Sequence, residues 1–154
     1  MSPSVPKMNA RVAKQIARAL AAADRGACFG PSFFLNQLGG LVRERCPKPE
    51  ERIGIVELHL ATGEILELCH IISLTPKWAV LATFAERTGH REGALMRTEL
   101  IPYEAIVRVG IRSEARSEGR IGFGQTKAPE VALERSVGAE QLLARAAQVS
   151  PRSP

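Results

Sequence analysis

The pattern of apolar residues changes its period once along this chain. Up to residue 46 apolar residues recur every three or four positions, as in amphipathic helices, and from residue 53 they alternate, as in strands. The change falls at the segment "CPKPEER", in which two prolines end helical structure and form a short, stiff linker. The pattern therefore predicts a helical N-terminal segment over residues 9–46 and a β domain over residues 53–112.

Two helices are predicted in the N-terminal segment, after a disordered lead-in at residues 1–8. The first begins at the capping residue Asn9 and continues to Asp24, and its apolar side carries Val12, Ile16, Leu20 and Ala23. The second begins at Pro31, a residue favoured in the first turn, and continues to Cys46. We expect it to break at Gly39–Gly40, because each glycine costs about 1 kcal/mol relative to alanine.

Five apolar segments in the β domain are short enough to be strands. The first two form a hairpin around the turn Thr62–Gly63, and the third has so few polar residues that burial on both faces is expected. The predicted strands are residues 55–60, 64–72, 77–84, 94–101 and 105–111.

The stretch "LIPYEAIVRV" interrupts a strand for only a few residues. Pro102 fixes φ at the start of the interruption, Glu104 and Ala105 tolerate helix, and Ile106 begins the next strand. Five short strands in one domain leave two exposed edges, which a strongly bent barrel can protect. We therefore interpret the interruption as a single helical turn at a barrel corner. The predicted fold is mainly β with flanking α: a five-stranded, strongly bent small barrel preceded by two helices.

The C-terminal segment, residues 113–154, is predicted to be flexible and partly helical. Its glycines 119, 122 and 124 have a spacing that differs from the dinucleotide fingerprint, and no βαβ unit surrounds them. Short amphipathic helices are expected over residues 129–148, with a break at Gly138.

Length and composition place the chain among ordinary globular proteins. Its 154 residues suit one domain with appendages, and no apolar run approaches the roughly 18–20 residues that span a bilayer. The N-terminus has no signal-peptide pattern, so we expect a cytoplasmic protein. The three cysteines are dispersed, without a CxxC pair, and are interpreted as buried free thiols: Cys28, Cys46 and Cys69.

The net charge of +5 is concentrated in the first third of the chain. Residues 1–52 carry nine basic and four acidic residues, whereas residues 53–112 carry six and seven. In the first helix Arg11, Lys14 and Arg18 form a basic stripe opposite the apolar side. A solvated helix face is the commoner explanation for such a stripe, and contact with nucleic-acid phosphates is the functional one.

The order of these elements resembles the small β-barrels of the SH3-like and Sm-like kind, above all the Sm-like (LSm) proteins that include the bacterial Hfq type. The similarity lies in a helix followed by five bent strands, in the first hairpin "VELHLATGEILE", and in the corner "LIPYEAIVRV". It covers about residues 53–112. The resemblance implies a ring-shaped homo-oligomer, joined by pairing of the fourth and fifth strands, and RNA as the ligand.

Under this resemblance Lys77 and Trp78 are the candidate RNA contacts in the barrel, with a base stacked on Trp78 and a phosphate at Lys77. The alternative for Trp78 is a core aromatic residue. The chain departs from the Hfq type at the corner, where Tyr103 and Glu104 replace a Lys-His pair that helps bind uridine. The Asp and Asn with which Sm proteins hold a base are also missing from "SLTPKWAV".

The sequence offers no candidate catalytic residue. The chain contains no GxSxG, HExxH or P-loop motif, and Glu57 and His59 on one strand face are more typical of a surface contact than of a general-base pair. No metal site, cofactor or catalytic residue is predicted. We expect a non-enzymatic Sm-like oligomeric RNA-binding protein. The alternative is a protein-interaction or structural module on the same barrel, with its flanking helices docked on a partner.

Overall fold

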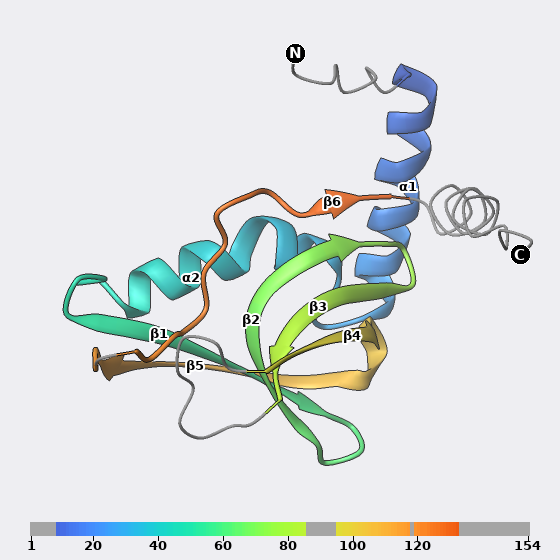
Figure 1. Cartoon of the computed structure of the whole chain (residues 1–154). Coiled ribbons are helices and arrows are strands. Elements are labelled where there is room, and N and C mark those ends of the chain that lie inside the picture. The colour runs from blue at the N-terminus through green and yellow to red at the C-terminus, as the bar shows by residue number, and fades with distance from the viewer. Residues whose placement is uncertain (1–8, 86–94, 118, 133–154) are drawn as a thin grey trace, which may run out of the picture.

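The computed structural model describes residues 9–85, 95–117 and 119–132, and Figure 1 shows their arrangement. An antiparallel sheet forms the body, one helix lies against the sheet, and helix α1 extends away from it. The mainly β class with flanking helices is therefore confirmed. Within the described ranges, no helix combines the length and the apolar character that crossing a membrane requires.

Helix α1, Ala10–Gly26, begins as the sequence predicts. The side chain of Asn9 caps it by accepting a hydrogen bond from the backbone N–H of Arg11, at 3.0 Å. Of the residues on its apolar side, Ile16 is buried, whereas Val12 remains 39% exposed. The first turns of α1 are therefore only partly packed against the described part of the chain.

The predicted break of the second helix at Gly39–Gly40 is wrong. The irregular part lies earlier, in the π-helical turn η1, Phe33–Gln37, and α2, Leu38–Arg45, continues regularly through both glycines. A π turn widens the helix, and here both Phe33 and Phe34 are buried although they are adjacent. The free-energy cost of two helical glycines is smaller than the free energy gained when α2 residues such as Leu38 are buried on the sheet.

The five predicted strands are present, but they do not close into a barrel. The sheet has the order β4-β3-β2-β1-β5, so β4 and β5 are its two edges and are not paired with each other. Register shifts interrupt the pairing of β1 with β5 and of β2 with β3. The strands are β1 Arg52–Leu60, β2 Ile65–Leu74, β3 Trp78–Phe84, β4 Met96–Pro102 and β5 Ile106–Ala115.

The single helical turn predicted between the last two strands is confirmed. A 3-10 turn, η2 Tyr103–Ala105, follows Pro102, whose φ of −59° suits this position. Tyr103 is buried in the core, and the carbonyl oxygen of Ala105 accepts a hydrogen bond from the N–H of Ala61, at 2.8 Å. The turn is thus attached both to the core and to the end of β1.

The hydrophobic core lies between the helix over residues 31–45 and one face of the bent sheet. The helix contributes Phe34, Leu38 and Val42, and each of the strands β1 to β4 contributes at least one buried apolar side chain. Burying an aliphatic or aromatic side chain of this kind contributes about 1.5–3 kcal/mol. The core therefore fixes the helix over β1 and β5.

Residues 119–132, here named the strap, lie along the line where β1 and β2 separate (Figure 1). The N–H of Phe123 donates to the carbonyl oxygen of Gly54 at 2.8 Å, and the N–H of Gly124 donates to that of Cys69 at 3.0 Å. The side-chain amide of Gln125 bonds both the N–H and the carbonyl oxygen of Ile71, at 2.8 and 2.9 Å. The strap thus satisfies backbone groups that neither strand satisfies for the other.

The strap ends in a short strand where a helix was expected. Strand β6, Glu130–Val131, pairs in parallel with the end of β2, because the strap already follows that strand. The predicted helices over the remainder of residues 129–148, with the break at Gly138, lie outside the described residues.

We predict that Gly122→Ala detaches the strap. A Cβ at this position would lie 2.5 Å from the carbonyl oxygen of Gly54. This oxygen belongs to the backbone of a strand, so moving it would disturb the pairing of that strand. The expected loss is about 2 kcal/mol of unfolding free energy, typical of overpacking. Hydrogen exchange should show faster exchange at the amides of Phe123 and Gly124.

Gly124→Ala is the matched control, because a Cβ there meets no atom within 4 Å. Equal effects of the two substitutions on exchange would contradict this account of the strap.

Candidate functional site

A cleft lies at the corner of the sheet where three segments meet. It has a volume of about 340 Å³ and is bounded by the end of α1, the turn between β2 and β3, and the turn η2. We name it the corner cleft. Its lining residues are Ala23, Gly26, Ala27, Pro76, Lys77, Trp78, Pro102, Tyr103 and Glu104.

The turn between β2 and β3 presents Lys77 and Trp78 to this cleft. The hydroxyl oxygen of Thr75 accepts hydrogen bonds from the backbone N–H groups of Lys77 and Trp78, at 3.3 and 3.1 Å. Such a turn is pinned by its own side chain, with Pro76 stiffening it further. Lys77 is exposed and Trp78 is half-buried outside the core cluster, so the alternative that Trp78 is a core aromatic residue is wrong.

Tyr103 joins the two turns that bound the cleft. Its hydroxyl donates a hydrogen bond of 2.7 Å to the carbonyl oxygen of Thr75. Burial raises the pKa of Tyr103 far above its ordinary value, and the nearby carboxylate of Asp24 raises it further. The phenol is therefore a neutral, structural donor.

The end of α1 is held over the corner by the only aspartate in the chain. The carboxylate of Asp24 accepts a hydrogen bond from the N–H of Ser32 at 2.9 Å and another from the Ser32 hydroxyl. Gly30 makes this approach possible, since a Cβ there would lie 2.9 Å from the Cα of Asp24. Sequence reasoning missed this role, although a single Asp near a Gly-Pro-Ser turn is a recognisable signal for a capping contact.

The lining of the corner cleft suits a flat, polar ligand. Trp78 offers an aromatic surface, Lys77 a cation and the exposed Glu104 a carboxylate that accepts hydrogen bonds. In the described part of the chain, no three His, Cys, Asp or Glu side chains are grouped as metal ligands would be. The arrangement can therefore stack and hydrogen-bond a ring.

The basic stripe of the first helix is separate from this cleft. Arg11, Lys14 and Arg18 are all exposed on α1, and none of them lines the corner cleft. Figure 1 shows that α1 extends away from the sheet beyond the corner. The structure thus brings Lys77 and Trp78 together and places the three helix cations along a neighbouring surface.

The cysteines differ in exposure. Cys46 is buried, and partial burial raises the pKa of the Cys69 thiol. Cys28 is exposed, so the prediction that it is buried is wrong. It follows the end of α1 in a turn, where nothing covers its side chain within the described residues.

Glu57 and His59, which share one strand face, lie 3.6 Å apart, and Glu57 also pairs with Arg112 at 2.6 Å.

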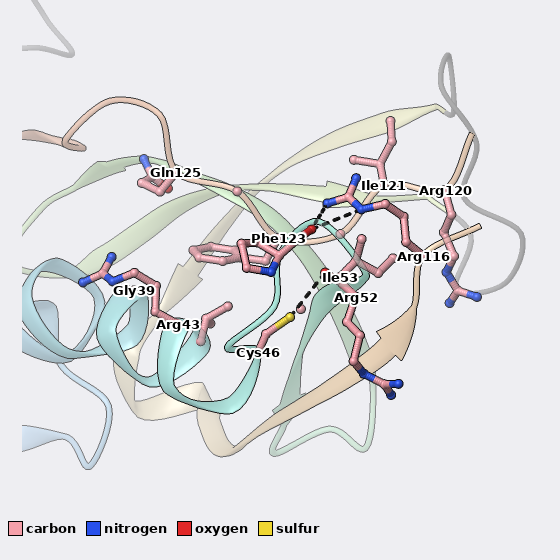
Figure 2. A pocket seen from close by; sticks show the side chains of 15 residues that line it. Gly39, Arg43, Cys46, Arg52, Ile53, Arg116, Arg120, Ile121, Phe123 and Gln125 are labelled. Atoms are coloured by element: carbon pink, nitrogen blue, oxygen red, sulfur yellow. Dashed lines mark hydrogen bonds between the residues drawn. The ribbon is translucent and has the colours of Figure 1, made fainter. Parts of the chain in front are cut away.

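A second cleft, named here the arginine cleft, was not predicted. It has a volume of about 490 Å³ and lies between α2, the first residues of β1 and the strap (Figure 2). Four arginines line it, and they come from separate segments of the chain: Arg43, Arg52, Arg116 and Arg120. The pairing of β1 with β5, the packing of α2 on β1 and the strap bring these segments together, so no local motif identifies the site. The basic excess of residues 1–52 was the one available signal.

Comparison with known proteins gives no assignment: no family model, no curated protein and no solved structure matches this chain.

We predict that Tyr103→Phe lowers the free energy of unfolding by about 1 kcal/mol at neutral pH, the usual net value of one hydrogen bond. Because the folded-state pKa of Tyr103 is raised, the wild-type protein also loses stability as pH rises above about 10, where an unfolded tyrosine ionises. The variant should lack that part of the alkaline loss.

Urea unfolding between neutral pH and pH 11 measures both effects. Parallel alkaline losses in the wild type and in Tyr103→Phe would contradict the assigned role of the buried phenol.

Proposed function

We propose that this protein is a non-enzymatic, self-associating RNA-binding protein of the Sm-like type. The observation that carries the proposal is the strand order β4-β3-β2-β1-β5, with a one-turn helix connecting the two edge strands. This order gives each chain two unpaired edges that are adjacent in sequence. It supports association in which β4 of one chain pairs with β5 of the next.

The side chains of the edge strands support such association. Among the described residues, β4 pairs only with β3, and β5 pairs only with β1. Apolar side chains on these strands are exposed: Met96 by 41%, Leu100 by 55% and Val107 by 58%. Exposed apolar edges are a liability that pairing with another copy removes. Because β4 meets β5 rather than another β4, the contact is heterologous and can close into a ring.

The corner cleft supports RNA as the ligand. A base can stack on Trp78 while Lys77 contacts a phosphate, which is how many proteins hold single-stranded RNA. Glu104 can accept a hydrogen bond from an exocyclic amino group, as carboxylates do from cytosine. The cleft therefore favours a base that carries an amino group over uracil, in agreement with the missing Lys-His pair.

The helix cations supply a second, less specific attraction. Arg11, Lys14 and Arg18 are exposed on α1, nearer its N-terminus than the helix residues that line the cleft. Contacts between such side chains and phosphates do not depend on base sequence and weaken steeply with salt.

The alternative function is a protein-interaction module without nucleic-acid binding. It is favoured by the 39% exposure of Val12 on the apolar side of α1, which a partner could cover. The net charge of −1 over residues 53–112 is also unfavourable for binding a polyanion to the sheet itself.

We predict that Leu100→Lys combined with Val107→Lys abolishes self-association. Both residues are exposed in the single chain, so the fold should survive, whereas lysines facing one another across paired edges repel. Size-exclusion chromatography with light scattering should give a closed oligomer for the wild type and a monomer for the variant.

Leu35→Lys is the matched control, since Leu35 is 39% exposed but lies on the helical segment rather than on an edge strand. A monomeric wild type would contradict edge-to-edge association.

We predict that Trp78→Leu and Arg11/Lys14/Arg18→Glu weaken RNA binding in different ways. Loss of the indole should reduce the affinity for single-stranded RNA about tenfold at every salt concentration, the value of one base stack. The triple change should also flatten the dependence of affinity on salt. Fluorescence anisotropy with labelled poly(C) and poly(U) oligomers measures both effects and the preference for amino-bearing bases.

Nucleic acid carried through purification, seen in the absorbance ratio at 260 and 280 nm, gives an independent readout for the wild type. Unchanged binding in both variants would favour the alternative function.

A further inference from the structure

The lining of the arginine cleft is basic. Its lining includes four arginines and no Asp or Glu. The guanidinium of Arg52 donates to the hydroxyl and carbonyl oxygens of Ser113, at 2.8 and 3.0 Å, and that of Arg116 donates to the carbonyl oxygen of Pro49. These partners orient the two side chains but do not compensate their charge.

The other two arginines differ from each other. Arg120 pairs with the carboxylate of Glu114 at 2.6 Å, while its buried Nε has no hydrogen-bond partner among the described residues. Arg43 forms no hydrogen bond or ion pair with any described residue and is exposed on α2. Three of the four guanidinium groups therefore have no carboxylate partner in the described part of the chain.

The backbone around Arg43 leaves the cleft accessible. Its guanidinium lies over Gly39 and Gly40, where added Cβ atoms would be 3.5 and 3.9 Å from the Nη atoms. On the opposite side Gly124 also has open space where a side chain would lie. The two glycines expected to break the helix thus leave room for the Arg43 guanidinium at one rim of the cleft.

The floor of the cleft is apolar and contains one aromatic ring. Val42, Ile53 and Phe123 line it, and the backbone of Phe123 is fixed by its hydrogen bond to Gly54. Figure 2 shows the Phe123 ring in the middle of the cleft, with Arg43 on the α2 side and Arg116 on the other. A bound molecule would therefore contact an apolar surface and guanidinium groups at once.

We propose that the arginine cleft binds a small organic phosphate with an aromatic body, of the size of a mononucleotide. The volume of about 490 Å³ is within the range of small-molecule sites. A phosphate monoester carries a charge of about −1.5 to −2 at pH 7, which matches uncompensated arginines better than a single carboxylate does. The phosphate contacts the free guanidinium of Arg43, with Arg116 adding charge, and the ring lies against Phe123.

Isothermal titration calorimetry on the full chain tests this site with adenosine 5′-monophosphate as the probe. We expect saturable binding, with affinity at least about tenfold weaker for adenosine and for glycerol 3-phosphate, which lack the phosphate and the ring respectively. Arg43→Gln should weaken binding about tenfold, the value of one charge-assisted hydrogen bond. Phe123→Leu should weaken binding of the nucleotide but not of glycerol 3-phosphate.

Two controls separate this site from the rest of the molecule. Arg108→Gln removes an exposed arginine of β5 outside the cleft, and Trp78→Leu alters only the corner cleft. Both should leave nucleotide binding unchanged, because neither residue lines the arginine cleft. Absence of saturable binding at millimolar nucleotide, equal losses in Arg108→Gln and Arg43→Gln, or loss of binding in Trp78→Leu alone would each overturn the proposal.

Discussion

The hydrogen bond from the hydroxyl of Tyr103 to the carbonyl oxygen of Thr75, 2.7 Å long, is the contact on which the corner of the sheet depends. It links the turn before β3 to the turn before β5, although 28 residues separate them in sequence. Because the phenol is buried, breaking the bond would leave its hydroxyl without a partner in the core, which costs more than the bond itself contributes. This contact therefore holds the turn that carries Lys77 and Trp78 against the turn η2.

A second constraint acts at the other end of the sheet, where β1 and β2 diverge. Their direct pairing covers only Val56–His59 on β1, so the earlier part of that strand needs another partner. The strap supplies it through Phe123 and completes the pairing of β2 through Gln125. The arginine cleft exists because the strap spans this divergence instead of extending the sheet, which leaves space between it and α2.

The sequence predicted correctly the secondary-structure elements that are determined by residues close together in the chain. Alternating apolar residues identified the strands, and Pro102 with its neighbours identified the one-turn corner, since both depend on residues close in the chain. Sequence reasoning failed where tertiary contacts outweigh local preference. Gly39 and Gly40 are helical because Leu38 and Val42 on either side of them are buried. The role of Gly122 depends on the carbonyl of Gly54, which no pattern of spacing reveals. Barrel closure also failed as an inference, because strand count does not determine it.

The two clefts differ in the kind of recognition that they can provide. The corner cleft combines one cation, one carboxylate and an indole, so its selectivity would come from the pattern of donors on a base. The arginine cleft combines several guanidinium groups with an apolar floor, so its selectivity would come from charge and size. Since the clefts share no lining residue and are built by different turns, a ligand in one does not occupy the other. The helical segment over residues 31–45 connects them, because Phe34 contacts the ring of Tyr103 at the corner cleft and Arg43 lines the arginine cleft.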